Sequence, residues 1–259
     1  MGNGKKSFNG GIQKMIDTVI NYCTVDFKFL EKSITECLKF SNQIIIPVCD
    51  HFLDGTSEDT ELLIKTYELQ KISPKISFIS YEWDSEKNAK YHHNMSRFIG
   101  HTFTTSDYIL FLDADELING SLMKEYLSLN EHIHYDAVAF KCYWYFREPI
   151  YRAKTTEMAG VLYNKRLCSE PMFFHQEERW AYRYMQNVRV KEEETLNGQI
   201  MCNHYSWVRT KEEMLRKVTS WAHSNDTNWT ALVEEEFSRE FNGTDFVHGY
   251  QYDILEKTT

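Results

Sequence analysis

The feature that most restricts the fold is the regular alternation of two hydrophobic patterns up to residue 112. Short apolar runs, each typical of a buried strand, alternate with longer segments whose apolar residues recur at helical spacing. The expected strands span 16–22, 43–48, 75–79 and 108–112, and the expected helices span 27–40, 57–71 and 88–104. Strands that alternate with helices form right-handed βαβ units, so the sequence predicts an α/β fold on a mostly parallel sheet.

The rhythm changes after residue 116. We expect a short helix at 121–129, a long aromatic strand at 137–146, an irregular segment at 147–200 and helices at 211–223 and 231–241. Ser57 is the expected N-cap of the helix at 57–71, because Glu58 and Asp59 supply acidic residues to its first turn.

Composition narrows the class of protein. The chain has 259 residues and a formal net charge of −9, which argues against a chain-wide basic surface for nucleic acid. Its six cysteines form no C-x-x-C pair, so we expect buried, reduced thiols and no zinc ribbon. The amino terminus lacks the apolar core of a signal peptide, and no apolar run approaches the ~18 residues of a membrane span. These features predict a soluble, cytoplasmic protein without a transmembrane segment.

Three carboxylates stand at the end of the fourth expected strand. The apolar run at 108–112 ends in Asp113, Asp115 and Glu116. Such strand ends lie at the edge of an open α/β sheet, where these folds bind ligands. Two carboxylates at positions i and i+2 can share one hard divalent cation, which commonly also holds a diphosphate. A solvated acidic turn is the alternative, since turns are rich in Asp.

Four segments resemble, in order and strand context, the family-2-like glycosyltransferases of the GT-A fold. They are a strand leading to an F-L-x-x-x-L-like helix at 25–34, a D-x-G-S-x-D-like stretch at 50–59, Arg97, and a D-x-D motif at 113–115. Arg97 stands sixteen residues before the D-x-D motif, as the family's arginine does. The resemblance covers residues 16–120 and departs from the family in an insertion at 51–53.

The resemblance implies a nucleotide-sugar donor, most often a UDP-sugar, whose diphosphate is neutralised by Mn²⁺ or Mg²⁺. It places Asp113 near the ribose and the metal, and Asp115 on the metal itself. Arg97 is expected to pair with a phosphate or with a strand-end carboxylate such as Asp113. A surface arginine on a helix is the alternative.

Other nucleotide contacts follow from the same comparison. Asp50 or Asp54 is expected to accept a hydrogen bond from the nucleobase, and the insertion between them leaves both candidates open. Ordinary turn aspartates are the alternative. Cys23 and Thr24 stand where the family has Asn-Glu after its first strand, so they are the corresponding candidates here.

An inverting transferase needs a general base that deprotonates the acceptor hydroxyl. The candidates are Glu177 and Glu178, because paired carboxylates beside Trp180 can raise one pKa toward neutrality, and Glu177 is the favoured one of the two. A solvated Glu-Glu turn is the alternative. The same stretch matches the Q-x-x-R-W pattern of processive polysaccharide synthases, which carry membrane helices that this chain lacks.

Histidines and tryptophans supply the remaining candidates. A late histidine completes the metal shell in some GT-A enzymes, and His204 is the candidate here, with a hydrogen-bonded core histidine as the alternative. Trp144, Trp207 and Trp221 can stack on sugar faces or simply pack in the core. The pair at 92–93 is expected to lie on a helix without forming a metal site, because adjacent helical residues diverge.

The sequence thus predicts a metal-dependent hexosyl- or pentosyltransferase that moves a sugar to a glycan or another hydroxyl acceptor, with inversion. We expect one GT-A domain over 1–259, in which 12–120 binds the nucleotide sugar and 121–259 binds the acceptor. One alternative is a nucleotidyltransferase, although residues 21–30 contain no glycine for a phosphate loop. A phosphatase of the D-x-D-x-T type would carry that motif at the first strand, whereas the D-x-D motif here follows the fourth strand. A non-catalytic sugar- or nucleotide-binding module is the other alternative.

Overall fold

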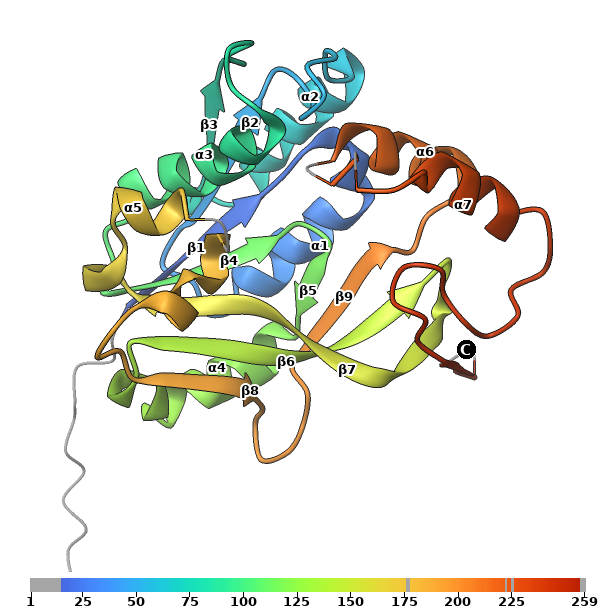
Figure 1. Cartoon of the computed structure of the whole chain (residues 1–259). Coiled ribbons are helices and arrows are strands. Elements are labelled where there is room, and N and C mark those ends of the chain that lie inside the picture. Colours follow the sequence, from blue (N-terminus) through green and yellow to red (C-terminus); the bar gives the residue numbers. More distant parts are fainter. Residues whose placement is uncertain (1–14, 176–177, 222, 225, 257–259) are drawn as a thin grey trace, which may run out of the picture.

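The computed structural model describes residues 15–175, 178–221, 223–224 and 226–256, which form a curled central sheet flanked by helices (Figure 1). The described strands are β1 (Ile16–Asn21), β2 (Ile44–Cys49), β3 (Ile76–Tyr81), β4 (Tyr108–Asp113), β5 (Glu116–Ile118), β6 (Ala137–Phe146), β7 (Glu148–Asn164), β8 (Val190–Glu194), β9 (Cys202–Trp207) and β10 (Tyr252–Ile254). The described α-helices are α1 (Phe27–Cys37), α2 (Thr60–Glu68), α3 (Ala89–Thr102), α4 (Gly120–Ser128), α5 (Glu170–Phe173), α6 (Lys211–Ser220) and α7 (Trp229–Glu236). This mixed α/β architecture is consistent with a Rossmann-like GT-A fold, as the sequence predicts.

Four parallel strands form the part of the sheet that the alternating pattern predicts. Their order is β3-β2-β1-β4, and the register sets Val19 beside Ile45 and Phe111. β7 pairs antiparallel with β4 and β6, β9 runs parallel to β6, and β5 pairs antiparallel with β9. The four predicted strands and the three helices between them are confirmed, with ends shifted by a few residues.

Helices cover both faces of the parallel strands. On one face, α1 and α4 bury Leu30, Ile34 and Met123 against β1, β2 and β4. On the other face, α3 and α5 pack beside Phe111 and Val161. Burial of these aliphatic and aromatic side chains supplies the main driving force for the two-sided core.

Gly100 allows α3 to approach β1 closely. A Cβ atom at this position would lie 2.3 Å from Cγ1 of Val19 and 3.3 Å from Cγ of Pro47. The absence of a side chain therefore sets the spacing between helix and sheet, and it fixes α3 beside the carboxyl ends of β1 and β2.

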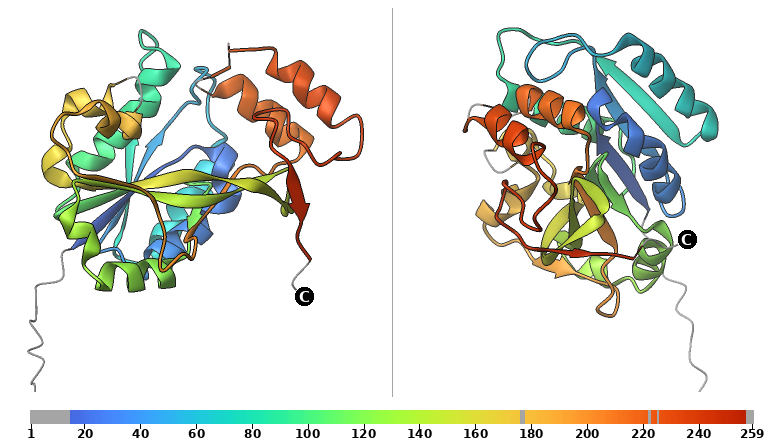
Figure 2. Two further views of the ribbon diagram at one scale, coloured as in Figure 1. Left: turned by 60° about the horizontal axis from the view of Figure 1, so that its bottom comes forward. Right: turned by 90° about the vertical axis from the view of Figure 1, so that its right-hand side faces the viewer.

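A long β6–β7 ribbon crosses the molecule, and α6 and α7 lie at one end of it (Figure 2). At that end, Trp207 of β9 packs with Met214 and Val218 of α6 and Val233 of α7. The helices predicted at 211–223 and 231–241 are confirmed in substance as Lys211–Ser220 and Trp229–Glu236.

The prediction of an irregular segment at 147–200 is wrong, because β7 spans Glu148–Asn164 and pairs with β4, β6 and β10. Only its last third is buried on both faces. Most of the earlier residues are half-buried or exposed, and their Arg, Lys and Glu side chains conceal the strand pattern. Gly160, with φ +68°, lies opposite a register shift in β6 and bends the strand back into the core.

The prediction that Ser57 caps the second helix is also wrong. The cap is Asp59, whose carboxylate accepts the Leu62 N–H at 3.0 Å, and α2 begins at Thr60. Ser57 instead forms an isolated β-bridge with His51. This bridge keeps the chain extended beyond the position where the acidic residues favour a helix start.

Two further predictions concern thiols and membranes. All six cysteines are free, and Cys37, Cys49, Cys142 and Cys202 are buried. Within the described ranges, no helix combines the length and the apolar character needed to cross a bilayer.

Candidate active site

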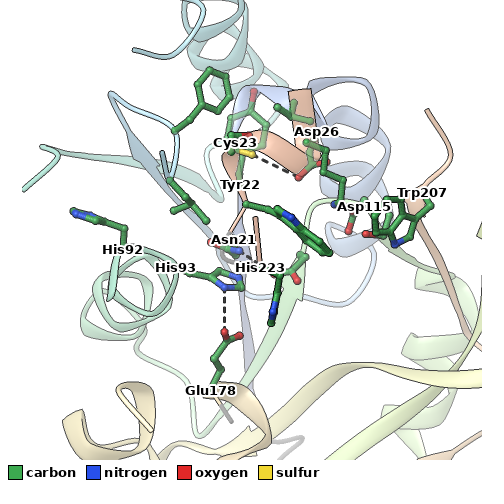
Figure 3. A pocket seen from close by; sticks show the side chains of 18 of the residues that line it. Asn21, Tyr22, Cys23, Asp26, His92, His93, Asp115, Glu178, Trp207 and His223 are labelled. Carbon is green, nitrogen blue, oxygen red and sulfur yellow. Dashed lines mark hydrogen bonds and ion pairs between the residues drawn. The ribbon is translucent and has the colours of Figure 1, made fainter. Parts of the chain in front are cut away.

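A cavity of about 490 Å³ opens at the carboxyl edge of the parallel strands (Figure 3). Asn21, Cys49 and Asp113 line it and are the last residues of β1, β2 and β4. Trp221 and His223, which follow α6, form another part of its wall. Its volume is in the range of small-molecule sites, about 300–1,000 Å³. It therefore lies where open α/β sheets bind ligands.

Asp113 is held by two arginines. Arg97 Nη2 donates to Asp113 Oδ1 at 2.5 Å, and Arg179 Nη2 lies 3.3 Å from Oδ2. Asn21 Nδ2 also donates to Oδ1, at 3.0 Å, since the register of β1 and β4 sets the two residues side by side. Burial would raise the pKa of Asp113, but Arg179 and Arg97 outweigh it and hold that pKa well below its usual range. Of the two partners predicted for Arg97, the structure contains the carboxylate.

Glu116 is completely buried and anchors the turn between β4 and β5. Its two carboxylate oxygens accept from Arg179 Nη1 and Nη2 at 2.7 and 2.5 Å, which is a bidentate pair. One of these oxygens also accepts the Asp113 N–H at 2.9 Å. The third carboxylate of the acidic tip therefore positions Asp113 and does not face the cavity as a ligand.

Asp115 faces three cationic side chains. His204 Nε2 lies 3.5 Å from Asp115 Oδ1, while Arg209 Nη2 and Lys217 Nζ lie 3.3 and 3.6 Å from Oδ2. Burial would raise the pKa of Asp115, but Lys217, His204 and Arg209 together lower it. Burial would lower the pKa of His204, yet hydrogen bonds to Asp115 and Cys142 and the nearby carboxylates raise it to about 10. The predicted neighbours Asp115 and His204 do come together.

Glu178, one of the two candidates for the base, lies in the cavity wall at the start of a 3₁₀ helix (Glu178–Tyr184). His93 Nδ1 is 3.2 Å from Oε1, and Arg97 Nη1 is 3.5 Å from Oε2. Burial would raise the pKa of Glu178, but His93 and Arg97 outweigh it and hold that pKa below its usual range. The prediction of a pKa raised toward neutrality is therefore wrong for Glu178, which is an anion at neutral pH because two cationic partners outweigh the effect of burial. Its backbone φ of 51° lies in the left-handed region. Glu177, the other candidate, is outside the described residues.

A second titratable group of the cavity wall is a glutamate that follows the insertion at 51–53. Glu58 lines the cavity, is 6% exposed and accepts hydrogen bonds from the backbone and hydroxyl of Thr24. Burial raises the pKa of Glu58 to about 7, against the opposite effect of Thr24. Thr24 thus contacts the cavity only through Glu58, whereas Cys23 lines it directly.

Asp50 and Asp54 both engage protein partners. Asp50 Oδ1 accepts the Trp83 N–H at 2.9 Å and lies 2.8 Å from His51 Nδ1. Asp54 accepts the Thr56 N–H at 2.9 Å and pairs with a guanidinium on α6. The residues between them, 51–53, contribute to the cavity wall. The insertion therefore brings its own side chains to the site in addition to separating the two aspartates.

The tryptophans and the histidine pair have distinct positions. Trp207 is 1% exposed and packs against Trp221, with ring centroids 5.4 Å apart, so its main role is in the core. Trp144 and Trp221 line the cavity and retain faces toward it. His92 Nε2 donates to the Asp84 carbonyl at 2.9 Å, while His93 pairs with Glu178, and both histidines lie on α3, as predicted.

A divalent ion finds a poor fit here. Among the residues that the structure describes, no three His, Cys, Asp or Glu side chains gather as a metal site. More directly, the oxygens of Asp113 and Asp115 already face four Arg or Lys side chains and the ring of His204. An ion attracted to these oxygens would be repelled by Arg209 and Lys217 at similar distances. Manganese at Asp113, Asp115 and His204 remains a prediction from the sequence.

Sequence reasoning assigned no role to Arg179, Arg209, Lys217 or Glu58. Arg179 stands in the Q-x-x-R-W match at 176–180, which was the available signal. Arg209 and Lys217 carry no local signal, because their partners lie ninety or more residues away in the chain.

Comparison with known proteins does not assign a family. No protein-family model matches the chain, and no curated protein matches it in sequence. Among solved structures it is similar to residues 1–349 of S. aureus TarS in complex with UDP, with a TM-score of 0.48 and 12% identity over 87% of this chain and 72% of that one. A second structure of TarS 1–349 gives 0.44 and 14% over 88% and 74%, and TarS itself gives 0.46 and 12% over 86% and 44%. Similarity at this level carries no information about activity.

Proposed function

We propose that the chain is a glycosyltransferase that moves a hexose or pentose from a nucleotide-sugar donor, by preference a UDP-sugar, to an acceptor hydroxyl. The observation that carries the proposal is the cavity at the tip of β4. There the D-x-D carboxylates, the arginine sixteen residues before them and the half-buried carboxylate of Glu178 meet at one sheet edge. The resemblance at 16–120 associates the D-x-D carboxylates and the arginine with sugar transfer.

The side of the cavity formed by β1, β2 and the insertion is suited to the nucleotide. His51 and Phe52 provide flat faces for a base, and aromatic faces commonly stack on such rings. Glu58 and Cys23 supply polar atoms on the same side. We place the nucleoside here and leave Asp50 and Asp54 as supports of this wall, through Trp83 and Thr56.

The opposite part of the wall is suited to the acceptor. Trp144, Trp221 and His248 line it, and ring faces pack well against the apolar face of a sugar. Glu178 stands at the same cavity as an anion whose pKa is held below its usual range, so it is a weak base. It accepts a hydrogen bond from the acceptor hydroxyl and takes the proton only as that oxygen bonds to the sugar and becomes acidic. The ion pairs with His93 and Arg97 hold the carboxylate in place. A single displacement of this kind inverts the anomeric centre.

The test is a screen of nucleotide sugars. The purified chain is mixed with UDP-sugars and GDP-sugars, with and without Mn²⁺, and both thermal stability and release of the nucleoside diphosphate are measured. We expect a UDP-sugar to raise the melting temperature, because a ligand of the native state stabilises it by mass action. We also expect slow release of UDP, accelerated by a hydroxyl acceptor.

The alternatives give different results in the same screen. Stabilisation without release, whatever the acceptor, would indicate a binding module. When a nucleoside triphosphate and a sugar phosphate replace the nucleotide sugar in the screen, release of pyrophosphate would indicate a nucleotidyltransferase. The absence of both stabilisation and nucleotide release with every donor would refute the proposed function.

A further inference from the structure

We infer that Lys217 of α6 is the cation that receives the diphosphate of the donor, in the role that the sequence assigns to a divalent metal. This inference rests on the proposed function and names how that site holds its anionic ligand. It follows from the way the cations of the site are distributed between carboxylates and the cavity.

Lys217 is the least restrained cation in the described part of the cavity wall. Its Nζ lies 3.6 Å from Asp115 Oδ2, beyond hydrogen-bonding distance, and its side chain is 14% exposed. An ammonium group carries three donors and rotates freely about its stem. The Lys217 head can therefore turn from Asp115 toward a phosphate in the cavity without breaking a short hydrogen bond.

The arginines of the site are committed to the protein. Arg209 is fully buried, and it donates to the Ser206 carbonyl at 2.8 Å and the Val25 carbonyl at 2.7 Å in addition to its carboxylate partners. Arg97 and Arg179 both hold Asp113, and Arg179 also holds Glu116 in a bidentate pair. Movement of any of them toward a ligand would take a close cation away from at least one carboxylate of the site, which is costly.

The helix that carries Lys217 is well fixed. Thr210 and Glu213 form a reciprocal capping box at its first turn, with bonds of 3.2 and 2.8 Å. Met214 and Val218 bury the same helix against the tryptophan cluster around Trp207. Lys217 thus projects from a rigid element and needs only side-chain rotation to reach a ligand.

The charges around Asp115 favour Lys217 over a divalent metal as the group that binds the diphosphate. A dication at Asp115 would lie close to Arg209, which has no room to withdraw. A diphosphate brings the opposite charge, and it gains from Lys217 without displacing any arginine. When the bond from the anomeric carbon to the diphosphate oxygen breaks, its electron pair remains on that oxygen, where Lys217 stabilises the charge. The acceptor oxygen bonds the same carbon, and its proton passes to Glu178.

The experiment measures UDP binding by titration calorimetry in EDTA and again in Mn²⁺, with inorganic pyrophosphate as a competitor. The variants are Lys217→Ala, Lys217→Arg and, as a matched control on the same helix, Lys211→Ala, whose ammonium pairs with Glu234 on α7. Thermal unfolding of each variant without ligand verifies that it is folded.

We expect UDP to bind in EDTA with an affinity within about threefold of that in Mn²⁺. Lys217→Ala should weaken binding by about 10–100-fold, as for loss of one charge-assisted contact, and Lys217→Arg should retain part of it. Lys211→Ala should bind as the parent does.

Two results would overturn the inference while leaving the proposed function in place: UDP binding that requires Mn²⁺, or binding that is unaffected by Lys217→Ala. If no nucleoside diphosphate binds in either buffer, the inference and the proposed function both fail. Unfolding of Lys217→Ala would shift the decision to Lys217→Arg, which must then bind more weakly than the parent.

Discussion

The buried pair of Glu116 and Arg179 should be the most sensitive electrostatic contact of the fold. Glu116 is completely buried and Arg179 is 7% exposed, so water screens their interaction little. Replacement of one partner leaves the other charge buried without full compensation, which typically costs about 3–5 kcal/mol. Glu116→Gln and Arg179→Met remove one charge each and largely preserve side-chain volume.

The structure indicates where each variant should fall in that range. In Glu116→Gln, Arg179 keeps Asp113 at 3.3 Å, and the amide oxygen of glutamine can still accept the Asp113 N–H. We therefore expect a loss of about 3 kcal/mol. Arg179→Met strands Glu116 and weakens the hold on Asp113, which retains Arg97, so its loss should approach about 5 kcal/mol.

Urea denaturation of the two single variants and the double variant measures the free energies of unfolding. The double variant should lose less than the sum of the single losses, by about 1–3 kcal/mol, because it leaves no unpaired charge between the two positions. An unchanged slope with denaturant would show that the same unfolding reaction is compared. A Glu116→Gln loss below about 1 kcal/mol, or strictly additive losses, would refute the reasoning.

Three further predictions concern catalysis, pH and packing. Glu178→Gln should lower kcat by about 100-fold or more with little change in donor KM, and equal turnover in steady-state assays would remove Glu178 as the base. The raised pKa of Glu58, about 7, means that the folded state binds this proton more tightly than the unfolded state, whose value is near 4.5. Stability should thus fall as pH rises from about 4.5 to 7, by about 3 kcal/mol at most, and Glu58→Gln should abolish this part of the pH profile in urea denaturation; identical profiles would contradict the assignment. Gly100→Ala should cost about 1–3 kcal/mol because its Cβ overlaps Val19, and Val19→Ala in the same chain should recover part of the loss, whereas an undiminished loss would contradict the packing argument.

Hydrophobic patterns in the sequence predicted the strands whose side chains are buried on both faces of the sheet. The run at 108–112 is apolar on both faces because β4 is covered by helices on both sides, so its burial can be read from the sequence. The strand at 148–164 could not be read in this way. Most of it is half-buried or exposed where it pairs with β6, so its polar side chains reflect solvent exposure and say little about backbone pairing.

The site shows the same division. The sequence places Asp113 and Asp115 at a strand end, and the structure agrees. It also groups Glu116 with these two carboxylates at the ligand-binding edge, whereas the structure buries Glu116 against Arg179, sixty-three residues later. A carboxylate and an arginine so far apart in sequence give no periodic signal, because their pairing depends on how β5, β9 and the segment after α5 meet in space.

This long-range pairing determines how the two halves of the chain depend on each other. The carboxylates of the acidic tip belong to residues 113–116, yet Arg179, Arg209 and Lys217, which neutralise them, come from the second half. Without those cations the tip would hold buried like charges, whose repulsion and desolvation disfavour the ionised forms. The second half of the chain therefore sets the charge at the tip of β4. It also places Lys217 there, which is the cation that we propose for the diphosphate of a donor.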